Sequence, residues 1–231
     1  MKVWLAWSSG KDSAWALHVL RREARVEVTG LLTTVSTARC RVAMHDVRVE
    51  LLQAQADAAG LPLHTVRLPD PCPNPDYEAA MRSALAAARG AGVEAVAFGD
   101  LYLEDIRRYR ETQMAGTGLS PLFPLWGRPT RELAGEMVEG GLRARVACVD
   151  PRRLEASFAG REFDRSFLDA LPAGIDPCGE NGEFHTCVVA GPMFSRRLDV
   201  ATGERVERDG YAYCDLLLTT REARHQAQGV R

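Results

Sequence analysis

A six-residue stretch, residues 8–13 (Ser-Ser-Gly-Lys-Asp-Ser), constrains the fold of this chain more than any other. It follows a short apolar run, Val3–Trp7, that predicts a strand, and it precedes Ala14–Arg21, which predicts a helix. The first N–H groups of a helix have no intrahelical partners, and the helix dipole favours negative charge there. Gly10 lets the backbone approach a ligand closely, while Lys11 and three serines add donors. The stretch therefore predicts a phosphate-binding turn; the alternative is a serine-capped helix after a buried strand.

The widespread phosphate loop G-x-x-x-x-G-K-[ST] does not describe this turn. Asp12 follows Gly10 and Lys11 where that loop needs Ser or Thr, and no glycine stands at the required earlier position. A phosphate at this turn would therefore be bound in a different way from that loop.

Strands and helices alternate over the first 126 residues. The patterns predict strands at 2–7, 26–33, 63–68, 93–98 and 119–125, and helices at 14–21, 46–59, 77–88 and 102–115. Residues 35–46 are expected to form a polar loop, and the prolines of 69–75 a stiff one. Short connections between alternating elements give an α/β fold, a doubly wound parallel sheet with right-handed crossovers. Ligands bind such sheets at the carboxyl ends of the strands.

The pattern changes after residue 126. We expect a helix over 131–139, a strand at 143–149, mostly helix over 152–170, a loop over 172–185, and strands at 186–190, 196–200, 204–207 and 211–218, with a turn at Thr202-Gly203. The predicted domains are therefore an α/β domain over 1–126 that carries the phosphate-binding turn, a smaller α+β domain over 127–220, and a polar tail over 221–231.

Composition excludes some classes of protein. The chain has 231 residues, 46% of them hydrophobic, which is enough for a sizeable core, and its net charge of −2 gives no electrostatic reason to expect a nucleic-acid partner. No run approaches the ~18 apolar residues of a membrane span, and the N-terminal apolar run is too short for a signal sequence. We expect no membrane partner and, by default, a cytoplasmic location. The six cysteines form no C-x-x-C pair and are expected to be free thiols.

A second polar cluster lies at 176–186, Asp-Pro-Cys-Gly-Glu-Asn-Gly-Glu-Phe-His-Thr. Its glycines and proline keep it irregular, and its carboxylates and imidazole suit a site that handles a cation, an amine or a proton. The alternative is a capped turn with satisfied polar groups. Cys178 beside His185 also fits a nucleophile, and Cys178, His185 and Cys187 fit part of a zinc site, although a fourth ligand is missing at the usual spacing.

These two stretches resemble known sequences. Residues 8–13 resemble the pyrophosphatase loop of N-type ATP pyrophosphatases (the PP-loop, of HUP-type fold), with Ser9 where that superfamily often has glycine. Residues 8–13, the more selective string at 178–186 and three further strings make the chain similar to the diphthine–ammonia ligase family and its bacterial relatives, from about residue 1 to residue 218. The three further strings are Met44-His45-Asp46, Phe98-Gly99-Asp100 and Phe123-Pro124-Leu125-Trp126.

The resemblance implies an ATP-dependent amide ligase with ATP and Mg²⁺ as cofactors. A substrate carboxylate would attack the α-phosphorus of ATP, pyrophosphate would leave, and ammonia would displace AMP from the acyl-adenylate. The implied partners are ATP, ammonia and a carboxylate-bearing acceptor. That acceptor is diphthine on an elongation factor in archaea and eukaryotes, and is unknown if the source is bacterial. The sequence leaves the source of ammonia and the oligomeric state open, a homodimer included.

The candidate site residues follow from both lines of reasoning. For the nucleotide we expect Ser8, Ser9, Gly10, Lys11, Asp12, Ser13, Thr33, Thr34, Gly99 and Asp100; for the metal, Asp100 and Glu104; for catalysis, Lys11, Glu180, Glu183 and His185. Several have ordinary alternatives. Asp12 can brace the loop instead of serving magnesium, Thr33 and Thr34 are good strand formers, and Asp100 can cap the next helix. Arg107 and Arg110 fit either a phosphate clamp or ion pairs with neighbouring glutamates, and His45 either a substrate contact or a surface position.

Two other functions remain open at this point. A tRNA-modifying enzyme of the thiolation type could use the same loop, although the missing C-x-x-C and the mild acidity argue against it. A nucleotide-binding regulator could bind ATP without turnover.

Overall fold

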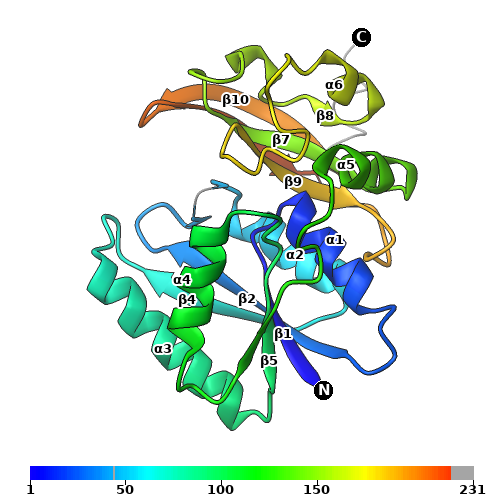
Figure 1. The fold of residues 1–231 in the computed structure, drawn as a ribbon. Coiled ribbons are helices and arrows are strands. Elements are labelled where there is room, and N and C mark those ends of the chain that lie inside the picture. Colours follow the sequence, from blue (N-terminus) through cyan, green and yellow to red (C-terminus); the bar gives the residue numbers. More distant parts are fainter. Residues whose placement is uncertain (44, 220–231) are drawn as a thin grey trace.

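The computed structural model describes residues 1–43 and 45–219 of the chain. The predicted tail over 221–231, residue 220 and Met44 lie outside the described residues. Two sheets form the described part, one above the other in Figure 1. The predicted fold class is confirmed: a mostly parallel sheet with helices on both faces, here sheet A, accompanies a separate antiparallel sheet, here sheet B. The boundaries of the two domains stay a prediction.

Sheet A is built from the first 122 residues. Its strands are β1 (Lys2–Ala6), β2 (Glu27–Ser36), β3 (Arg41–Val42), β4 (Leu63–Leu68), β5 (Ala95–Ala97) and β6 (Ser120–Leu122). β1 pairs in parallel with β2 and β5, β5 with β6, and β2 with β4, while β3 pairs antiparallel with the end of β2. The chain thus winds from β1 outward to β4, then returns to β5 and winds the other way. This reversal leaves a switch point between β1 and β5, the place where open α/β sheets bind ligands.

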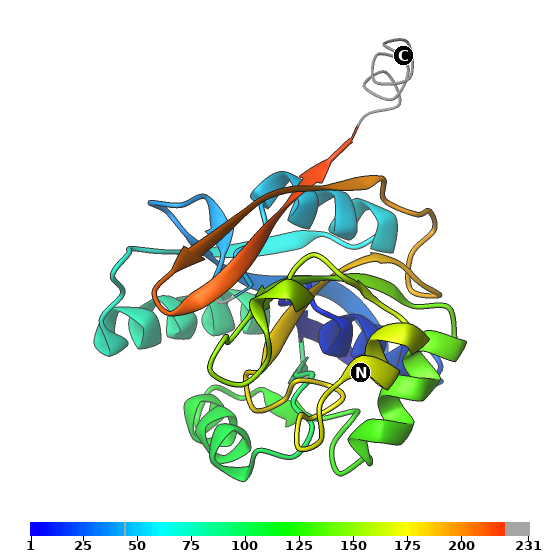
Figure 2. The same ribbon diagram turned by 90° about the horizontal axis from the view of Figure 1, so that it is seen from above.

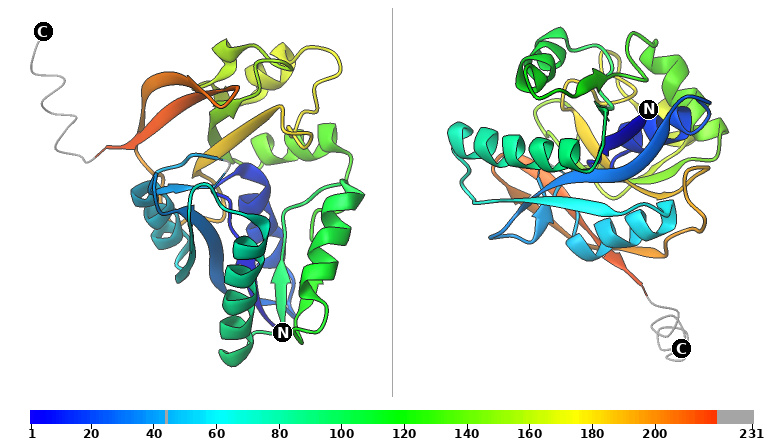
Figure 3. Two further views of the ribbon diagram at one scale, coloured as in Figure 1. Left: turned by 90° about the vertical axis from the view of Figure 1, so that its left-hand side faces the viewer. Right: turned by 90° about the horizontal axis from the view of Figure 1, so that it is seen from below.

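Helices cover both faces of sheet A. The crossover helices are α1 (Lys11–Leu20), α2 (Val49–Ala59), α3 (Asn74–Gly90) and α4 (Glu104–Met114). Seen from below, α3 and α4 lie on the face opposite α2 (Figure 3). Along β1, Val3 and Leu5 belong to one buried cluster and Trp4 to the other, because successive side chains point to opposite faces. Both faces of the strand are therefore buried, as parallel sheets require.

Sheet B contains β7 (Arg143–Val149), β8 (Glu162–Phe163), β9 (Phe184–Ala190), β10 (Val200–Arg208) and β11 (Tyr211–Leu218). β7 pairs antiparallel with β8, β9 and β11, and β11 pairs with β10. The helices α5 (Thr130–Glu139) and α6 (Arg165–Ala170) accompany it (Figure 1). From above, β10 and β11 run past α2 (Figure 2), so sheet B lies over the carboxyl edge of sheet A.

Three predictions in this half are wrong. Residues 152–170 are not mostly helical: only the short 3₁₀ turn η1 (Ala156–Phe158) and α6 are, with β8 between them. Gly160 interrupts the pattern at φ +83°, where an added Cβ would lie 2.9 Å from Cys214 Sγ. Asp164 then starts α6 by accepting a hydrogen bond from Phe167 N.

Thr202-Gly203 is not a turn, and 196–199 is not a strand. β10 continues through Gly203 as a bulge, with a register shift between Thr202 and Arg205. A Cβ on Gly203 would sit 3.3 Å from Asp215 Cβ, so the glycine permits the close approach of β11. The turn lies instead at Asp209-Gly210, where both residues have positive φ, 54° and 78°, as tight hairpins need.

The prediction for α3 misses its first turn. The helix begins at Asn74, within the expected stiff loop, because Pro75 occupies one of the first helical positions, where its missing N–H costs nothing. The expected polar loop 35–46 contains the short strand β3.

The buried amide of Gln55 joins the two sheets. This α2 side chain accepts a hydrogen bond from Trp7 Nε1 (3.0 Å) and donates to Ser9 O (3.1 Å) and to Val188 O of β9 (2.7 Å). It is fully buried, so each of these bonds replaces a bond to water.

We expect Gln55→Leu to lower the free energy of unfolding by about 2 kcal/mol, because Trp7 Nε1 would lose its acceptor in a dry environment. Urea unfolding measures this. Gln53→Leu is the matched control: Gln53 lies exposed on the same helix, and its change should stay within about 0.5 kcal/mol. Equal effects for the two variants would contradict the buried link.

Candidate nucleotide and amidation site

The switch point brings together the two loops that the sequence singled out. The 8–13 loop follows β1, and Gly99-Asp100 follow β5. A Cβ added to Gly99 would lie 2.9 Å from Ser13 N and 3.0 Å from Asp12 C, so only glycine lets the two loops touch without a shift. Both loops therefore line one cavity at the carboxyl edge of sheet A.

The first cavity has a volume of about 500 Å³, within the range of sites for small ligands. Its polar side is formed by the two loops and the second polar cluster: Ser8, Lys11, Asp12, Ser13, Thr33, Thr34, His45, Gly99, Asp100, Cys178, Glu180, His185 and Thr186. Its apolar side lies against α3 and α4, with Tyr77, Met81, Leu85, Phe98, Ile106, Tyr109 and Met114. Such a cavity offers charged groups at one end and a dry surface for a ring at the other.

The polar loop after β1 is held from behind. Ser9 is fully buried with φ 72°, and its carbonyl accepts bonds from Gln55 Nε2 and from Val188 N (2.9 Å). The backbone therefore turns at the position where the resembling loops often have glycine. Ser13 Oγ donates to Gly10 O (3.0 Å) and lies 3.2 Å from Ser8 Oγ, which closes the turn around the helix start.

The second polar cluster meets this loop directly. Lys11 N donates to Thr186 Oγ1 (3.0 Å), and Lys11 Nζ donates to the carbonyl of Cys178. His45 Nδ1 lies 3.0 Å from Thr186 O, and Leu101 N donates to Glu180 Oε1 (2.8 Å). Segments 175 residues apart in the sequence thus form one site.

Lys11 and Asp12 form an ion pair at the helix start, with the buried Lys11 Nζ 2.9 Å from Asp12 Oδ2. The rings of Phe163 and Phe184 lie 5.8 and 5.4 Å from Nζ. Burial alone would lower the pKa of Lys11, but the carboxylates of Asp12 and Glu180 outweigh it and hold the pKa above its usual value. For Asp12, burial prevails over Lys11 and raises the pKa. The ammonium is therefore fixed as a cation at neutral pH.

Glu180 has a pKa suited to proton transfer near neutral pH. Burial raises the pKa to about 7, against the bond from Leu101 N, and Asp12 and Asp100 add to the increase. A carboxylate with this pKa can both take and return a proton at physiological pH.

The two histidines of the site are neutral at neutral pH. Burial lowers the pKa of His45 to about 4 and that of His185 to about 3, and their rings lie 4.7 Å apart between centroids. The nearby His45 ring lowers the pKa of His185 further, since two imidazolium ions so close would repel each other. His185 therefore offers a neutral donor or acceptor rather than a cation.

Four of the predicted site residues do not line the first cavity. Ser9, Gly10 and Glu183 support the cavity from outside its lining, and Glu104 is exposed on α4. Glu183 accepts bonds from Asp176 N (3.3 Å) and Asn181 Nδ2 (3.0 Å), so it braces the loop that carries Glu180. The hydroxyl of Thr33 donates to Trp7 O (2.8 Å).

The geometry also bears on the alternatives left open. Burial raises the pKa of Cys178, whose thiol donates to Thr130 O, so the group is a thiol rather than a thiolate nucleophile. The part of the chain that the structure describes contains no group of three or more His, Cys, Asp or Glu side chains that could hold a metal. Arg107 pairs with Glu111 (2.8 Å), whereas Arg110 lines the cavity and lies 3.8 Å from Asp100. Asp100 does not cap α4, whose N-cap is Leu103.

A magnesium ion fits the two carboxylates that face the first cavity. Asp12 Oδ1 and Asp100 Oδ2 are buried and have no hydrogen-bond partner among the described residues. Burial raises the pKa of Asp100 despite the guanidinium of Arg110 3.8 Å away, and it raises that of Asp12 despite Lys11. Mg²⁺ needs only one or two protein carboxylates when phosphate oxygens and water complete its shell.

Two features of the site escaped the reasoning from sequence. Gln55 could have been noticed as a polar residue on the apolar stripe of the 46–59 helix, one turn after Leu51. The apolar side of the cavity gave no signal, because Tyr77, Met81 and Tyr109 have the same spacing as an ordinary core stripe.

No described helix has the length and apolar character needed to cross a bilayer.

Comparison with known proteins gives two matches that together span most of the chain. A family model described as the diphthamide synthase N-terminal domain matches residues 1–120, and one described as the diphthamide synthase C-terminal domain matches residues 129–220. The first alone covers more than half of the chain.

Curated relatives show similarity in about half of the chain. This chain is 30% identical over 128 residues to a protein named diphthine–ammonia ligase from Schizosaccharomyces pombe. The match covers 54% of this chain and 21% of that protein. Proteins of the same name from Rattus norvegicus (30% over 128 residues; 52% and 47%) and Danio rerio (32% over 123 residues; 49% and 47%) are also similar. The matched stretch is thus less than half the length of each of these relatives.

We expect Ser9→Gly to raise the free energy of unfolding by about 0.5–1 kcal/mol. Relief of the left-handed backbone is worth about 1–2 kcal/mol, and the added freedom of glycine in the unfolded chain costs about 0.5–1 kcal/mol. Chemical denaturation measures the difference. Ser8→Gly, at a position without positive φ, is the control and should destabilise; a loss of stability in Ser9→Gly would contradict the strain.

The buried histidines predict a pH dependence of stability. Because the folded pKa of His185 lies below the unfolded value of 6.5, the unfolded state binds more protons between about pH 3 and 6.5. His185 therefore takes stability away as the pH falls through that window, by about 1.4 kcal/mol per pH unit. Glu180, with its raised pKa, acts in the opposite direction.

Urea unfolding of wild type and His185→Gln between pH 7 and 5 separates these contributions. The slope of the unfolding free energy against pH should be smaller in the variant, by about 1 kcal/mol per pH unit averaged over this range and by about 1.4 kcal/mol per pH unit at its acid end. Parallel curves would show that His185 does not titrate in this way.

Proposed function

The chain belongs to the diphthamide synthase family, and on that premise we propose that it is an ATP-dependent amide ligase that adenylates a carboxylate and transfers ammonia to it. The relatives named diphthine–ammonia ligase support diphthine as the acceptor. The observation that carries the proposal is the single cavity shared by the loop after β1, the loop after β5 and the 176–186 cluster.

The proposed nucleotide position follows from charge. The triphosphate lies at the start of α1, against Lys11, Ser8 and Ser13, where the helix dipole and unpaired N–H groups favour anions. Asp12 and Asp100 would hold Mg²⁺, which when bound neutralises charge on the phosphate oxygens. Thr34 and the end of β2 would lie near the adenosine, with the apolar side of the cavity available to its base. Glu104, exposed on α4, is not needed in this arrangement.

The first step is an attack on ATP by the acceptor. A carboxylate oxygen bonds to the α-phosphorus while the bond from that phosphorus to the bridging oxygen breaks, and pyrophosphate leaves with the electron pair. The cation of Lys11 is placed to stabilise the charge that develops on the departing group. The product is an acyl-adenylate and pyrophosphate.

The second step is the attack of ammonia on the acyl carbon. The carbon–oxygen bond to AMP breaks, AMP leaves as an anion, and the nitrogen loses one proton. We assign that proton to Glu180, whose pKa of about 7 suits a base. His185, as a neutral imidazole, orients a reactant by a hydrogen bond, and Glu183 holds the Glu180 loop in place through Asp176 N and Asn181.

The direct test combines the protein with ATP, Mg²⁺, ammonium and an elongation factor that carries unamidated diphthine. The proposal expects AMP and pyrophosphate in equal amounts and conversion of the acid to the amide, read by mass spectrometry. ATP binding without AMP, under this condition and with a panel of other carboxylates, would favour a nucleotide-binding regulator instead. Transfer of sulfur to tRNA, with steeply salt-dependent RNA binding, would favour the thiolation type of enzyme.

Lys11→Ala should lower kcat/KM for ATP by roughly 100-fold, because the fixed cation beside the leaving pyrophosphate would be lost. Initial rates of AMP release measure this. Arg131→Ala, a change on the exposed start of α5, is the control and should leave the rate within a factor of two. Unchanged turnover in a folded Lys11→Ala protein would remove the lysine from the mechanism.

Glu183→Gln should spare ATP affinity but slow amide formation, because Glu183 acts on the loop and not on the nucleotide. Equilibrium binding of ATP and single-turnover amide formation separate the two effects. A weaker affinity for ATP with unchanged amide formation would place the residue in the wrong half of the reaction.

A further inference from the structure

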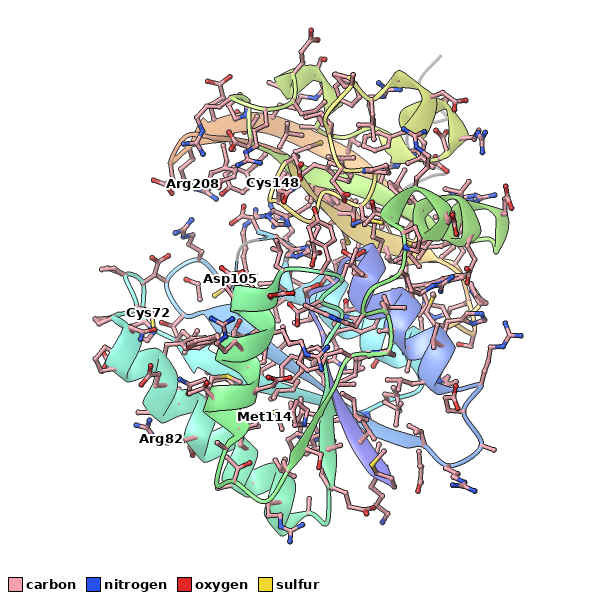
Figure 4. All side chains as sticks on the ribbon, in the orientation of Figure 1. Cys72, Arg82, Asp105, Met114, Cys148 and Arg208 are labelled. Atoms are coloured by element: carbon pink, nitrogen blue, oxygen red, sulfur yellow. The ribbon has the colours of Figure 1, made fainter. Side chains whose placement is uncertain are left out.

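Arg110 brings a cation to the apolar side of the first cavity. It lies on α4 between Asp105, near the end of the helix that is next to sheet B, and Met114, near the opposite end (Figure 4). Its Cα is about 7.5 Å further along the helix axis than that of Asp105. Because helical side chains lean toward the N-terminus of their helix, a long arginine here reaches back toward the carboxyl edge of sheet A.

Two contacts fix the direction of this side chain. Arg110 Cζ lies 5.1 Å from the centroid of the Phe98 ring, and Phe98 belongs to the buried cluster that includes residues of α3 and α4. Arg110 Nε lies 3.8 Å from Asp100 Oδ2. Asp100 directly follows Gly99, the residue that touches the start of α1. The guanidinium therefore lies between the phosphate-binding turn and the apolar side of the cavity.

The protein leaves the donors of Arg110 unused. The distance to Asp100 is longer than a hydrogen bond, and Nε is buried without a hydrogen-bond partner among the described residues. Arg107, one turn earlier on the same helix, instead donates to Glu111 (2.8 Å). The donors of Arg110 are thus available to a ligand in the cavity.

The arginines of a second, smaller cavity beside β3 show the contrast. Arg39 Nε donates to Asp70. Arg41 Nη1 donates to Asp215 Oδ1 (2.9 Å). Both therefore have a carboxylate partner at hydrogen-bond distance, which Arg110 lacks.

The charge of the first cavity favours an anion once the metal site is filled. Its described lining carries the cations Lys11 and Arg110 and the carboxylates Asp12, Asp100 and Glu180. In the proposed function Asp12 and Asp100 hold Mg²⁺, so the positive charges outnumber the negative ones. Glu180, with its pKa of about 7, is only partly charged at neutral pH. An anion at Arg110 is therefore compatible with the charge of its surroundings.

Position selects the anion. Lys11 Nζ lies on the sheet B side of the turn, where it donates to the carbonyl of Cys178. Arg110 lies on the α4 side, over Phe98. A nucleotide with its pyrophosphate end at Lys11 and its base on the apolar side has to run between these two cations. Its α-phosphate is the charged group that comes next to Arg110.

We propose that Arg110 binds the α-phosphate of ATP and keeps this contact through both steps of the reaction. This inference rests on the proposed function, which supplies the positions of the pyrophosphate and the base. In the first step the guanidinium neutralises charge on the non-bridging oxygens while the acceptor carboxylate attacks the phosphorus. In the second step the phosphate gains a second negative charge as AMP leaves, and the paired N–H groups of a guanidinium suit such a group.

Comparison of AMP with adenosine tests the contact without turnover. Calorimetric titrations with Mg²⁺ present give the ratio of Kd for adenosine to Kd for AMP, which reports what the α-phosphate adds. This ratio should exceed 10 in the wild type and fall at least 10-fold in Arg110→Met, whose apolar stem still covers Phe98. Arg110→Lys, which keeps the charge but loses the fork, should lower it less. Arg108→Met, at an exposed position of the same helix, is the control and should leave it within a factor of two.

Two further measurements separate the α-phosphate from the other anions of the reaction. Arg110→Met should leave Kd for pyrophosphate within a factor of two, because Lys11 and the turn hold that end of ATP. It should lower kcat for AMP release at least 10-fold and leave KM for the acceptor within a factor of two.

The outcomes distinguish the two proposals. An unchanged ratio in Arg110→Met overturns the inference, as does an equal loss of affinity for adenosine, which would place the residue at the base. A loss of affinity for pyrophosphate alone would assign Arg110 to the departing group, and a rise in KM for the acceptor alone would assign it to the acceptor carboxylate; both overturn it while the proposed function stands. If the ratio changes as expected but the wild type releases no AMP with any acceptor, the proposed function fails and Arg110 remains a phosphate ligand of a nucleotide-binding regulator.

Discussion

The hydrogen bonds between the loop after β1 and strand β9 are the constraint on which the rest of the structure depends. Lys11 N donates to Thr186 Oγ1, Val188 N donates to Ser9 O, and the amide of Gln55 joins Ser9 O to Val188 O. An α/β sheet alone offers a phosphate site that is open on one side. These bonds set sheet B over the open side, so that the 176–186 cluster closes the cavity and supplies Glu180 and His185.

Burial then shapes the electrostatics of the cavity. Carboxylates and imidazoles removed from water shift toward their neutral forms, and Glu180, Asp12 and Asp100 have raised pKa values while those of His45 and His185 are lowered. Lys11 keeps its charge because Asp12 is paired with it. The cavity thus holds the fixed cations of Lys11 and Arg110 and several groups that change charge readily, a combination that suits pyrophosphate departure followed by proton transfer.

Much of this arrangement is predictable from sequence, and the misses have physical causes. The parallel sheet and the turn at residues 8–13 follow from local patterns, and the resemblance adds the 176–186 cluster to the candidate site. The position of Glu183 does not, because a glutamate that braces a loop and one that faces a ligand look alike in sequence. Thr202-Gly203 suggests a turn from local chemistry, yet tertiary pairing with β11 keeps it in a strand. The different surroundings of Arg107 and Arg110 had no sequence signal, because two arginines on one helix look alike until the fold shows which one faces the cavity.

The central claim is that the turn at the start of α1 binds the triphosphate beside the 176–186 cluster. A crystal structure with Mg²⁺ and an ATP analogue that carries a methylene bridge between its α and β phosphates tests it most directly. The account predicts the β and γ phosphates within hydrogen-bond distance of Lys11 and the backbone of the turn, the metal on Asp12 or Asp100, and the α-phosphate on the side of Glu180 and His185. A nucleotide with its phosphates away from the turn, or with Glu180 and His185 remote from the α-phosphate, would contradict it.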